Sequence, residues 1–163
     1  MNKKDVLYFL EKEKVKYEIT EHEAVFNMEQ LAQVELPYPE CDAKNIFVRD
    51  DKKLNYYLIT VKNNKRVDLK VFKKTYGTRH LSFASEEDLL DILKLKAGSV
   101  SPLGLLNDNQ LKVKFYLDKD FLVGNQIIGV HPNDNTATVW LNANELVNLI
   151  KKHGNEIEIV EIN

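Results

Sequence analysis

Lys44 and Asn45 stand at the start of an apolar run whose composition is typical of a buried strand. The run itself, residues 46–48, is branched or aromatic, and charged residues bound it. A lysine in this place either extends from a strand end to solvent or lies, with the neighbouring amide, at the mouth of a pocket. In a pocket, its charge would face a phosphate or a developing oxyanion. Residues 98–102 and 129–135 bear on this choice.

A loop over residues 98–104 is the second stretch whose residues could take part in a reaction. Its sequence is Gly-Ser-Val-Ser-Pro-Leu-Gly. Glycine lets the backbone approach a ligand closely, and proline stiffens the exit from the loop. Successive exposed N–H groups in such a loop can bind a carbonyl oxygen or its oxyanion, although the same composition also suits a plain connection. Ser99 and Ser101 adjoin no His/Asp arrangement and no GxSxG elbow, so we predict no covalent intermediate.

His131 is the third candidate, in a polar turn that follows an apolar strand. Beside the rigid Pro132, its imidazole can accept a proton or hydrogen-bond a substrate amino group. A histidine in a turn can equally be a solvated surface residue. Residues 133–135, Asn-Asp-Asn, are explicable as turn formers whose side chains satisfy nearby backbone. None of the three candidates is specific by itself.

Composition limits the class of protein. The chain has 163 residues, 44% hydrophobic and 29% charged, which predicts one soluble globular domain over residues 1–163. No run is long enough for a membrane span and no signal peptide is recognisable, so we expect no membrane partner. The single cysteine, Cys41, permits no internal disulfide and fits a reducing cytoplasm. Histidines without HxxxH spacing argue against a metal site, and no cofactor motif is present.

Charge is distributed unevenly along the chain. The net charge is −2, yet residues 62–80 hold seven cationic residues against the single carboxylate of Asp68. This segment is either a solvated lysine-rich face or a contact for one part of a polyanion. The candidate contact residues are Lys70, Lys73, Lys74 and Arg79.

Periodicity predicts an α+β chain whose mostly short connections argue against a doubly wound fold. Helices are expected over residues 3–14, from Asn27 to about Val34, around 69–75, after Ser85, and between Asn142 and Gly154. Strands are expected over residues 15–20, 43–49, 54–61, 81–83, 111–117, 126–130, 136–141 and 156–162. These elements would place the three candidates at strand ends and loops of a mixed sheet.

Four segments together carry a resemblance that none carries alone. In chain order they are Lys44-Asn45-Ile46-Phe47, residues 81–85, Gly98–Pro102 and Gly129–Thr138. Nearly the whole chain resembles the YbaK/prolyl-tRNA synthetase-associated editing domains, and most closely their freestanding alanyl-tRNA(Pro) deacylases, called ProXp-ala or PrdX. The pairing of KNIF with GVHPNDNTATV is the specific part of the resemblance. Relatives often have phenylalanine where this chain has Val130.

The resemblance implies a single α+β domain with a mixed, curved β-sheet flanked by helices. It implies hydrolysis of the ester that joins a wrong amino acid to the terminal adenosine of tRNA(Pro), without a cofactor. The partners would be the tRNA(Pro) acceptor end and prolyl-tRNA synthetase, with no DNA. The implied catalytic residues are Lys44, Asn45, Gly98, Ser99 and His131. The implied substrate-binding residues are Phe47, Val100, Ser101, Pro102, Leu103, Gly129, Val130 and Pro132.

An aminoacyl ester is already activated, so its hydrolysis needs a positioned water and oxyanion stabilisation more than a strong nucleophile. We expect Lys44 to hold a phosphate of the terminal nucleotide and the backbone of residues 98–102 to polarise the ester carbonyl. Asn45 and His131 would engage the amino group or the water. The resemblance therefore requires the four segments to converge on one cleft.

Specificity for alanine over proline requires a small pocket, because size exclusion discriminates better than the reward for one methyl group. Phe47, Leu103 and Val130 are the expected walls, and the basic segment 62–80 is the expected contact for the acceptor stem. Two other functions stay open: a cysteinyl-tRNA(Pro) deacylase, against which the His131-Pro132 context argues, and a non-catalytic module that binds charged tRNA. Cys41 lacks the resolving partner that a redox thiol needs.

Overall fold

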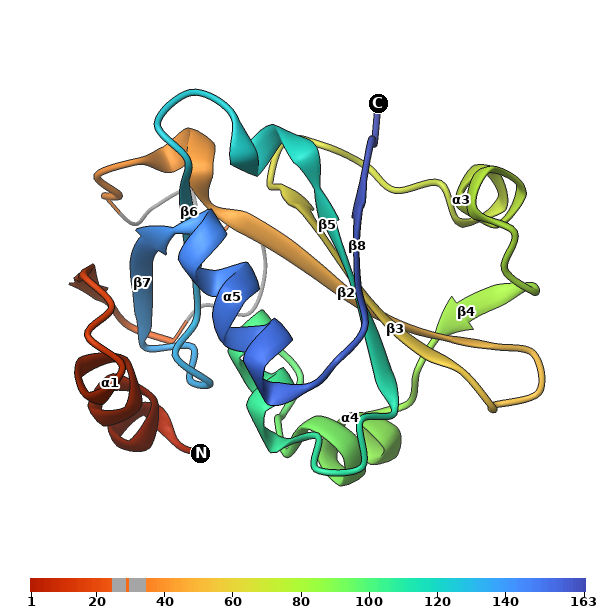
Figure 1. Cartoon of the computed structure of the whole chain (residues 1–163), viewed down its shortest axis with the longest axis horizontal. Helices are drawn as coiled ribbons and strands as arrows, with labels where there is room; N and C mark the ends of the chain where they lie inside the picture. Colours follow the sequence, from red (N-terminus) through yellow and green to blue (C-terminus); the bar gives the residue numbers. More distant parts are fainter. Residues whose placement is uncertain (25–28, 30–34) are drawn as a thin grey trace.

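The computed structural model describes residues 1–24, 29 and 35–163 (Figure 1). The helix expected from Asn27 to about Val34 lies outside the described residues, apart from Glu29. The other expected helices and strands are all present, most with boundaries within two residues of those predicted. One shift of two residues is at the strand predicted from Leu111, which begins at Val113. Leu111 has a left-handed φ of 54°, and the Asp108 carboxylate accepts the N–H of Val113 at 2.9 Å, so the turn continues for two more residues.

A five-stranded mixed sheet forms the larger part of the fold, with the strand order β4-β2-β3-β5-β8. β2 and β3 form the expected antiparallel hairpin, and β4 pairs with the second half of β2. β5 and β8 extend the sheet in parallel. The strands are β2 (Ala43–Asp50), β3 (Tyr56–Lys62), β4 (Leu81–Phe83), β5 (Val113–Asp118) and β8 (Ile157–Val160).

A second, antiparallel sheet has the order β1-β7-β6, with β1 (Tyr17–Glu21), β7 (Ala137–Asn142) and β6 (Ile127–Val130). An isolated parallel bridge between Asp42 and Gly129 joins it to the start of β2. The expected mixed sheet is thus divided into two sheets that meet where Lys44 and Asn45 enter the larger one. The α+β class, with helices flanking a mixed sheet, is confirmed.

The helices begin at the polar caps expected from the sequence. The side chains of Asn2, Asp68, Ser85 and Asn142 each accept a backbone N–H of the first turn that has no partner within the helix. Gly154, with φ 118°, ends the last helix. These helices are α1 (Lys3–Lys12), α3 (Leu69–Tyr76), α4 (Glu86–Leu93) and α5 (Ala143–His153); short 3-10 helices are η1 (Pro39–Cys41), η2 (Pro102–Asn107) and η3 (Lys119–Leu122).

The core consists of two clusters on opposite faces of the five-stranded sheet. The larger buries side chains of α1, α4, η2 and α5 together with residues of both sheets. The smaller lies under α3, where the rings of Phe72 and Tyr116 pack edge to face with centroids 4.9 Å apart. Because η2 and β6 both contribute to the larger cluster, the 98–102 loop and the His131 turn begin or end in packed core.

Candidate active site

Asn45 links β2 to the 98–102 loop. Its Nδ2 donates to the carbonyl oxygen of Val100 at 3.4 Å, and its Oδ1 accepts the hydroxyl of Thr60 at 2.6 Å. Thr60, fully buried on the neighbouring strand, fixes which way the amide points. Thr60 could not be predicted as part of the site, because a threonine within a strand carries no sign of its partner across the hairpin.

Ser101 links the same loop to the His131 turn. Its hydroxyl, fully buried, donates to the carbonyl oxygen of His131 at 2.6 Å and accepts the N–H of Leu103 at 3.1 Å. The hydroxyl proton and one lone pair of Ser101 are thereby engaged within the protein. Gly98 begins the loop with φ +90°, a conformation that side-chain-bearing residues rarely adopt.

The backbone of Lys44 lies between two of these links. Two residues before it, Asp42 bridges to Gly129, and one residue after it, Asn45 reaches Val100. Lys44 is partly exposed, and its side chain has no hydrogen bond or ion pair with the described residues. Strand alternation directs its side chain to the face opposite Asn45. The KNIF, GSVSP and GVHP segments are thus neighbours, and the role of Lys44 stays a prediction.

The fourth segment of the resemblance lies further along β2. Leu81 pairs with Asp50 and Phe83 with Val48, and the N–H of Ala84 donates to the carbonyl oxygen of Phe47 at 3.0 Å. It therefore flanks the second half of the strand rather than the loop. Its connection to the other segments runs through Phe47, two residues from Asn45.

His131 has a defined tautomer when neutral. Its Nδ1 lies 2.9 Å from the carbonyl oxygen of Ala137, which can only accept, so Nδ1 carries the proton and Nε2 is the free acceptor. Burial lowers the pKa of His131 and nearby His22 lowers it further, while the contact with Ala137 and the charge of Asp134 act in the opposite sense. The structure thus holds a neutral imidazole acceptor beside the candidate loop.

His22 is a residue that the sequence analysis missed. Its ring centroid lies 6.3 Å from that of His131, and its Nε2 is 3.1 Å from the hydroxyl of Thr138. It directly follows β1, whose Glu21 pairs with Ala137. Since the two histidines are separated by most of the chain, only the pairing of β1 with β7 reveals their proximity.

We expect the rate of deacylation to fall at acidic pH, with a midpoint below the ordinary histidine pKa of about 6.5. Protonation of Nε2 would remove the acceptor of His131, and its lowered pKa moves this loss to lower pH. A pH profile of kcat/KM measures this loss of activity at acidic pH. His22→Asn should move the midpoint of the loss up towards the ordinary histidine value, and His131→Asn should abolish the loss. An acidic loss unchanged in both variants would show that another group titrates.

The expected pocket walls belong to the packed core. Leu103 is fully buried and Val130 and Phe47 are 2% and 6% exposed, all within the larger cluster. Pro132 is also buried, and Val100 is half-buried. Their part in substrate binding stays a prediction.

Asp42 is a buried carboxyl beside the candidate site. It is 6% exposed, and burial raises its pKa from 3.8 to about 7, against a weaker opposing effect of the Ala43 N–H. Because the folded-state pKa is raised, the stability that protonation contributes is present below pH 3.8 and is lost as the pH rises to about 7.

Asp42→Asn should therefore stabilise the protein above pH 7 and have little effect near pH 4. The shift of the Asp42 pKa corresponds to about 4 kcal/mol of unfolding free energy, because each pKa unit is about 1.4 kcal/mol. Urea unfolding of both proteins from pH 4 to 8 measures the difference. Parallel stability curves would show that Asp42 ionises normally in the folded protein.

The predicted tRNA contacts lie away from these segments. Lys70, Lys73 and Lys74 are exposed on α3, which lies at the opposite end of the molecule's long axis from β6 and β7 (Figure 1). Arg79 is engaged by the carboxylate of Asp51 through two hydrogen bonds. Lys65 is likewise held by acidic side chains, so part of the positive charge counted in the sequence is neutralised.

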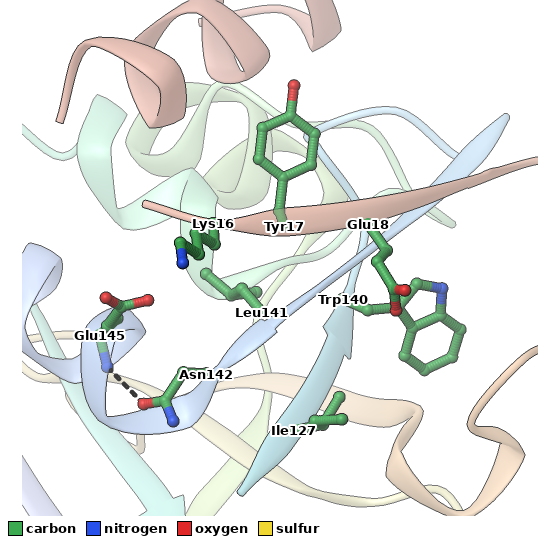
Figure 2. Close-up of a pocket in the computed structure, with 8 residues that line it drawn as sticks. All are labelled: Lys16, Tyr17, Glu18, Ile127, Trp140, Leu141, Asn142 and Glu145. Carbon is green, nitrogen blue, oxygen red and sulfur yellow. Dashed lines mark hydrogen bonds between the residues drawn. The ribbon is translucent and has the colours of Figure 1, made fainter. Parts of the chain in front are cut away.

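A pocket of about 500 Å³ lies on the smaller sheet (Figure 2). Figure 2 shows Trp140 and Glu18 on one side of it and Lys16, Asn142 and Glu145 on the other. Ile127 contributes from β6. None of the predicted site residues lines it.

Within the described chain, no three metal-ligating side chains gather to hold a metal ion. None of the described helices is long and apolar enough to cross a membrane.

Comparison with known proteins agrees with the geometry. Residues 22–149 match the aminoacyl-tRNA editing domain family. The prolyl-tRNA editing protein ProX of Acetoanaerobium sticklandii is 38% identical over 160 residues, which cover 98% of this chain and 97% of that protein. The prolyl-tRNA synthetase associated domain-containing protein 1 of Mus musculus is 33% identical, covering 87% of this chain and 85% of that protein.

The fold has a counterpart among solved structures. A crystal structure proposed to be a trans-editing enzyme for prolyl tRNA synthetase superposes with a TM-score of 0.70 at 22% identity, covering 99% of this chain and 97% of that one. The resemblance inferred from KNIF and GVHPNDNTATV is confirmed, and so is the enzyme class, an aminoacyl-tRNA deacylase. The chain belongs to the aminoacyl-tRNA editing domain family.

Proposed function

We propose that the protein is a trans-editing hydrolase that removes alanine from mischarged Ala-tRNA(Pro). The observation that carries this proposal is the pair of contacts from the 98–102 loop, Val100 to Asn45 and Ser101 to His131. These contacts join the three segments on which the chemistry was predicted. The names of the ProX relative and the trans-editing structure support a substrate charged on tRNA(Pro).

The proposed reaction is attack of water on the ester carbonyl, with departure of the terminal ribose hydroxyl. Backbone N–H groups of the loop would stabilise the oxyanion. Lys44, whose side chain leaves β2 on the face opposite Asn45, would hold a phosphate of the terminal nucleotide from that side. Nε2 of His131, a free acceptor at neutral pH, would accept a hydrogen bond from the water or the amino group. Asn45 is a positioning residue in this scheme, because both ends of its amide contact protein.

The partners follow from the substrate. The enzyme would bind the acceptor end of tRNA(Pro) and act beside prolyl-tRNA synthetase, in the cytoplasm where charged tRNA is used. The exposed lysines of α3 are candidates for contact with a more distant part of the tRNA, since the helix lies at the far end of the molecule (Figure 1). The measured salt dependence of tRNA binding would report such phosphate contacts.

Deacylation of Ala-, Cys-, Ser- and Pro-tRNA(Pro) by the wild type and by Lys44→Ala tests the proposal. We expect rapid release of alanine alone and a loss of about 10²-fold in Lys44→Ala, the usual scale for one electrostatic contact at a reacting centre. Lys52→Ala, in the exposed turn between β2 and β3, is the matched control and should retain the wild-type rate. Release of cysteine instead would change the substrate, and release of none with tRNA still bound would identify a non-catalytic binding module.

A further inference from the structure

A second cavity adjoins the 98–102 loop at Ser99. It has a volume of about 580 Å³ and lies between residues 94–99 and the turn that follows His131, residues 133–135. Ser99 lines it, while the next residue, Val100, contacts Asn45. The 98–102 loop therefore borders this cavity at Ser99 and meets β2 at the next residue.

The lining of this cavity is positively charged. Lys94 and Lys96 contribute ammonium groups, and Asp134 is its single acidic residue. The Asp134 carboxylate already accepts the N–H and the hydroxyl of Thr136. Nζ of Lys94 donates to the carbonyl oxygen of Asp91 at 2.7 Å, whereas the side chain of Lys96 has no hydrogen bond or ion pair with the described residues. An anionic ligand would thus find an available ammonium group here.

Asn133 supplies a hydrogen-bond acceptor for a ligand. Its Nδ2 donates to the carbonyl oxygens of Met1 at 3.1 Å and Leu103 at 3.5 Å, which fixes the orientation of the amide. Its Oδ1 is buried and is without a hydrogen-bond partner among the described residues. A buried acceptor left unpaired is destabilising, so the site favours a ligand with a hydroxyl or amino donor. Asn133 also has a left-handed φ of 61°, held by the turn.

We propose that this cavity binds the sugar–phosphate strand that precedes the terminal adenosine of the tRNA. The inference rests on the proposed function for its location, because a strand entering the reaction centre must pass one side of the 98–102 loop. Phosphate oxygens accept from Lys96 and Lys94, and a ribose 2′-hydroxyl donates to Oδ1 of Asn133. A single-stranded RNA end presents both groups together, whereas inorganic phosphate presents no comparable ribose donor.

Binding of an uncharged RNA minihelix ending in ACCA tests the inference directly. By fluorescence anisotropy, Lys96→Glu should raise Kd about tenfold and reduce the salt slope by about one, the amount expected for one phosphate contact. Lys52→Glu, the same charge change in the β2–β3 turn, should bind as the wild type does. Replacing the ACCA riboses by deoxyriboses should weaken wild-type binding. Equal Kd values for Lys96→Glu and Lys52→Glu would overturn the proposal.

Kinetics separates this inference from the proposed function. Lys96→Glu should raise KM for alanyl-tRNA and leave hydrolysis of alanyl-adenosine, which lacks the preceding strand, at the wild-type rate. An equal loss on both substrates would place Lys96 in the reaction centre and overturn the inference alone. If the wild type hydrolyses neither substrate but binds the minihelix through Lys96, the proposed hydrolase fails and the RNA site stands.

Discussion

Asn45→Ala should lower the rate of deacylation by about 10²-fold, because small displacements of groups around a reacting centre have effects of this size. The substitution removes the donor to Val100 and leaves the 98–102 loop without its link to β2. It also leaves the buried hydroxyl of Thr60 without an acceptor, which costs about 1–3 kcal/mol of unfolding free energy. The measurements are kcat and KM on alanyl-tRNA(Pro) and the free energy of unfolding in urea.

Two further variants separate positioning from stability. Asn45→Asp retains an acceptor for Thr60 but replaces the donor to Val100 by a carboxylate that repels its carbonyl oxygen, so it should lose the activity. Thr60→Val leaves the donor to Val100 in place, so it should lower the stability with a smaller change in kcat. If Asn45→Asp is as active as the wild type, the link to Val100 does not position the loop.

Gly129→Ala should destabilise the protein by about 3 kcal/mol, the upper part of the range for overpacking a core. A Cβ atom there would lie 2.3 Å from Cζ3 of Trp140 and 2.6 Å from its Cε3. The indole cannot easily retreat, because it is 2% exposed, its Nε1 donates to Thr20 at 2.9 Å, and Tyr38 packs against it. For a chain of this size we expect the melting temperature to fall by roughly 6–12 °C.

The clash with Trp140 can be tested by a double-mutant cycle. In a Trp140→Leu background, the alanine at position 129 should cost less than about 1 kcal/mol, because the ring atoms it meets are absent. Circular dichroism melts of the four proteins give the coupling. An equal cost in both backgrounds would show that the requirement for glycine comes from the backbone of β6, next to the Asp42 bridge. Either outcome concerns the junction that places His131, two residues later.

Local patterns were sufficient to predict the elements. Helix starts were identified from Asn2, Asp68, Ser85 and Asn142, because a capping side chain bonds to N–H groups only two or three residues away. The β2–β3 hairpin followed from two apolar runs separated by a polar turn. The family was recognised because the KNIF motif and the GVHPNDNTATV motif are each an unbroken stretch of sequence. Each of these features is contained in a short stretch of chain.

The ion pairs of the basic segment 62–80 could not be predicted from the sequence. Seven cations were counted in residues 62–80, but Lys65 and Arg79 are held by acidic residues remote in sequence. Their partners come from elements that pack together only in the folded chain, so a count of charges along the sequence overstated the patch. The three lysines predicted on α3 remain exposed. Figure 1 shows α3 far from β6, which no linear pattern could indicate.

The class of fold, the family and the residues on which the chemistry was predicted could all be read from the amino-acid sequence. Which of these residues meet depends on the folded chain: Asn45 contacts Val100, 55 residues apart, and Ser101 contacts His131, 30 residues apart. It also brought His22 to His131 and left Oδ1 of Asn133 buried without a partner among the described residues. Such contacts depend on strand pairing and on packing between elements, and neither periodicity nor capping within a segment specifies them.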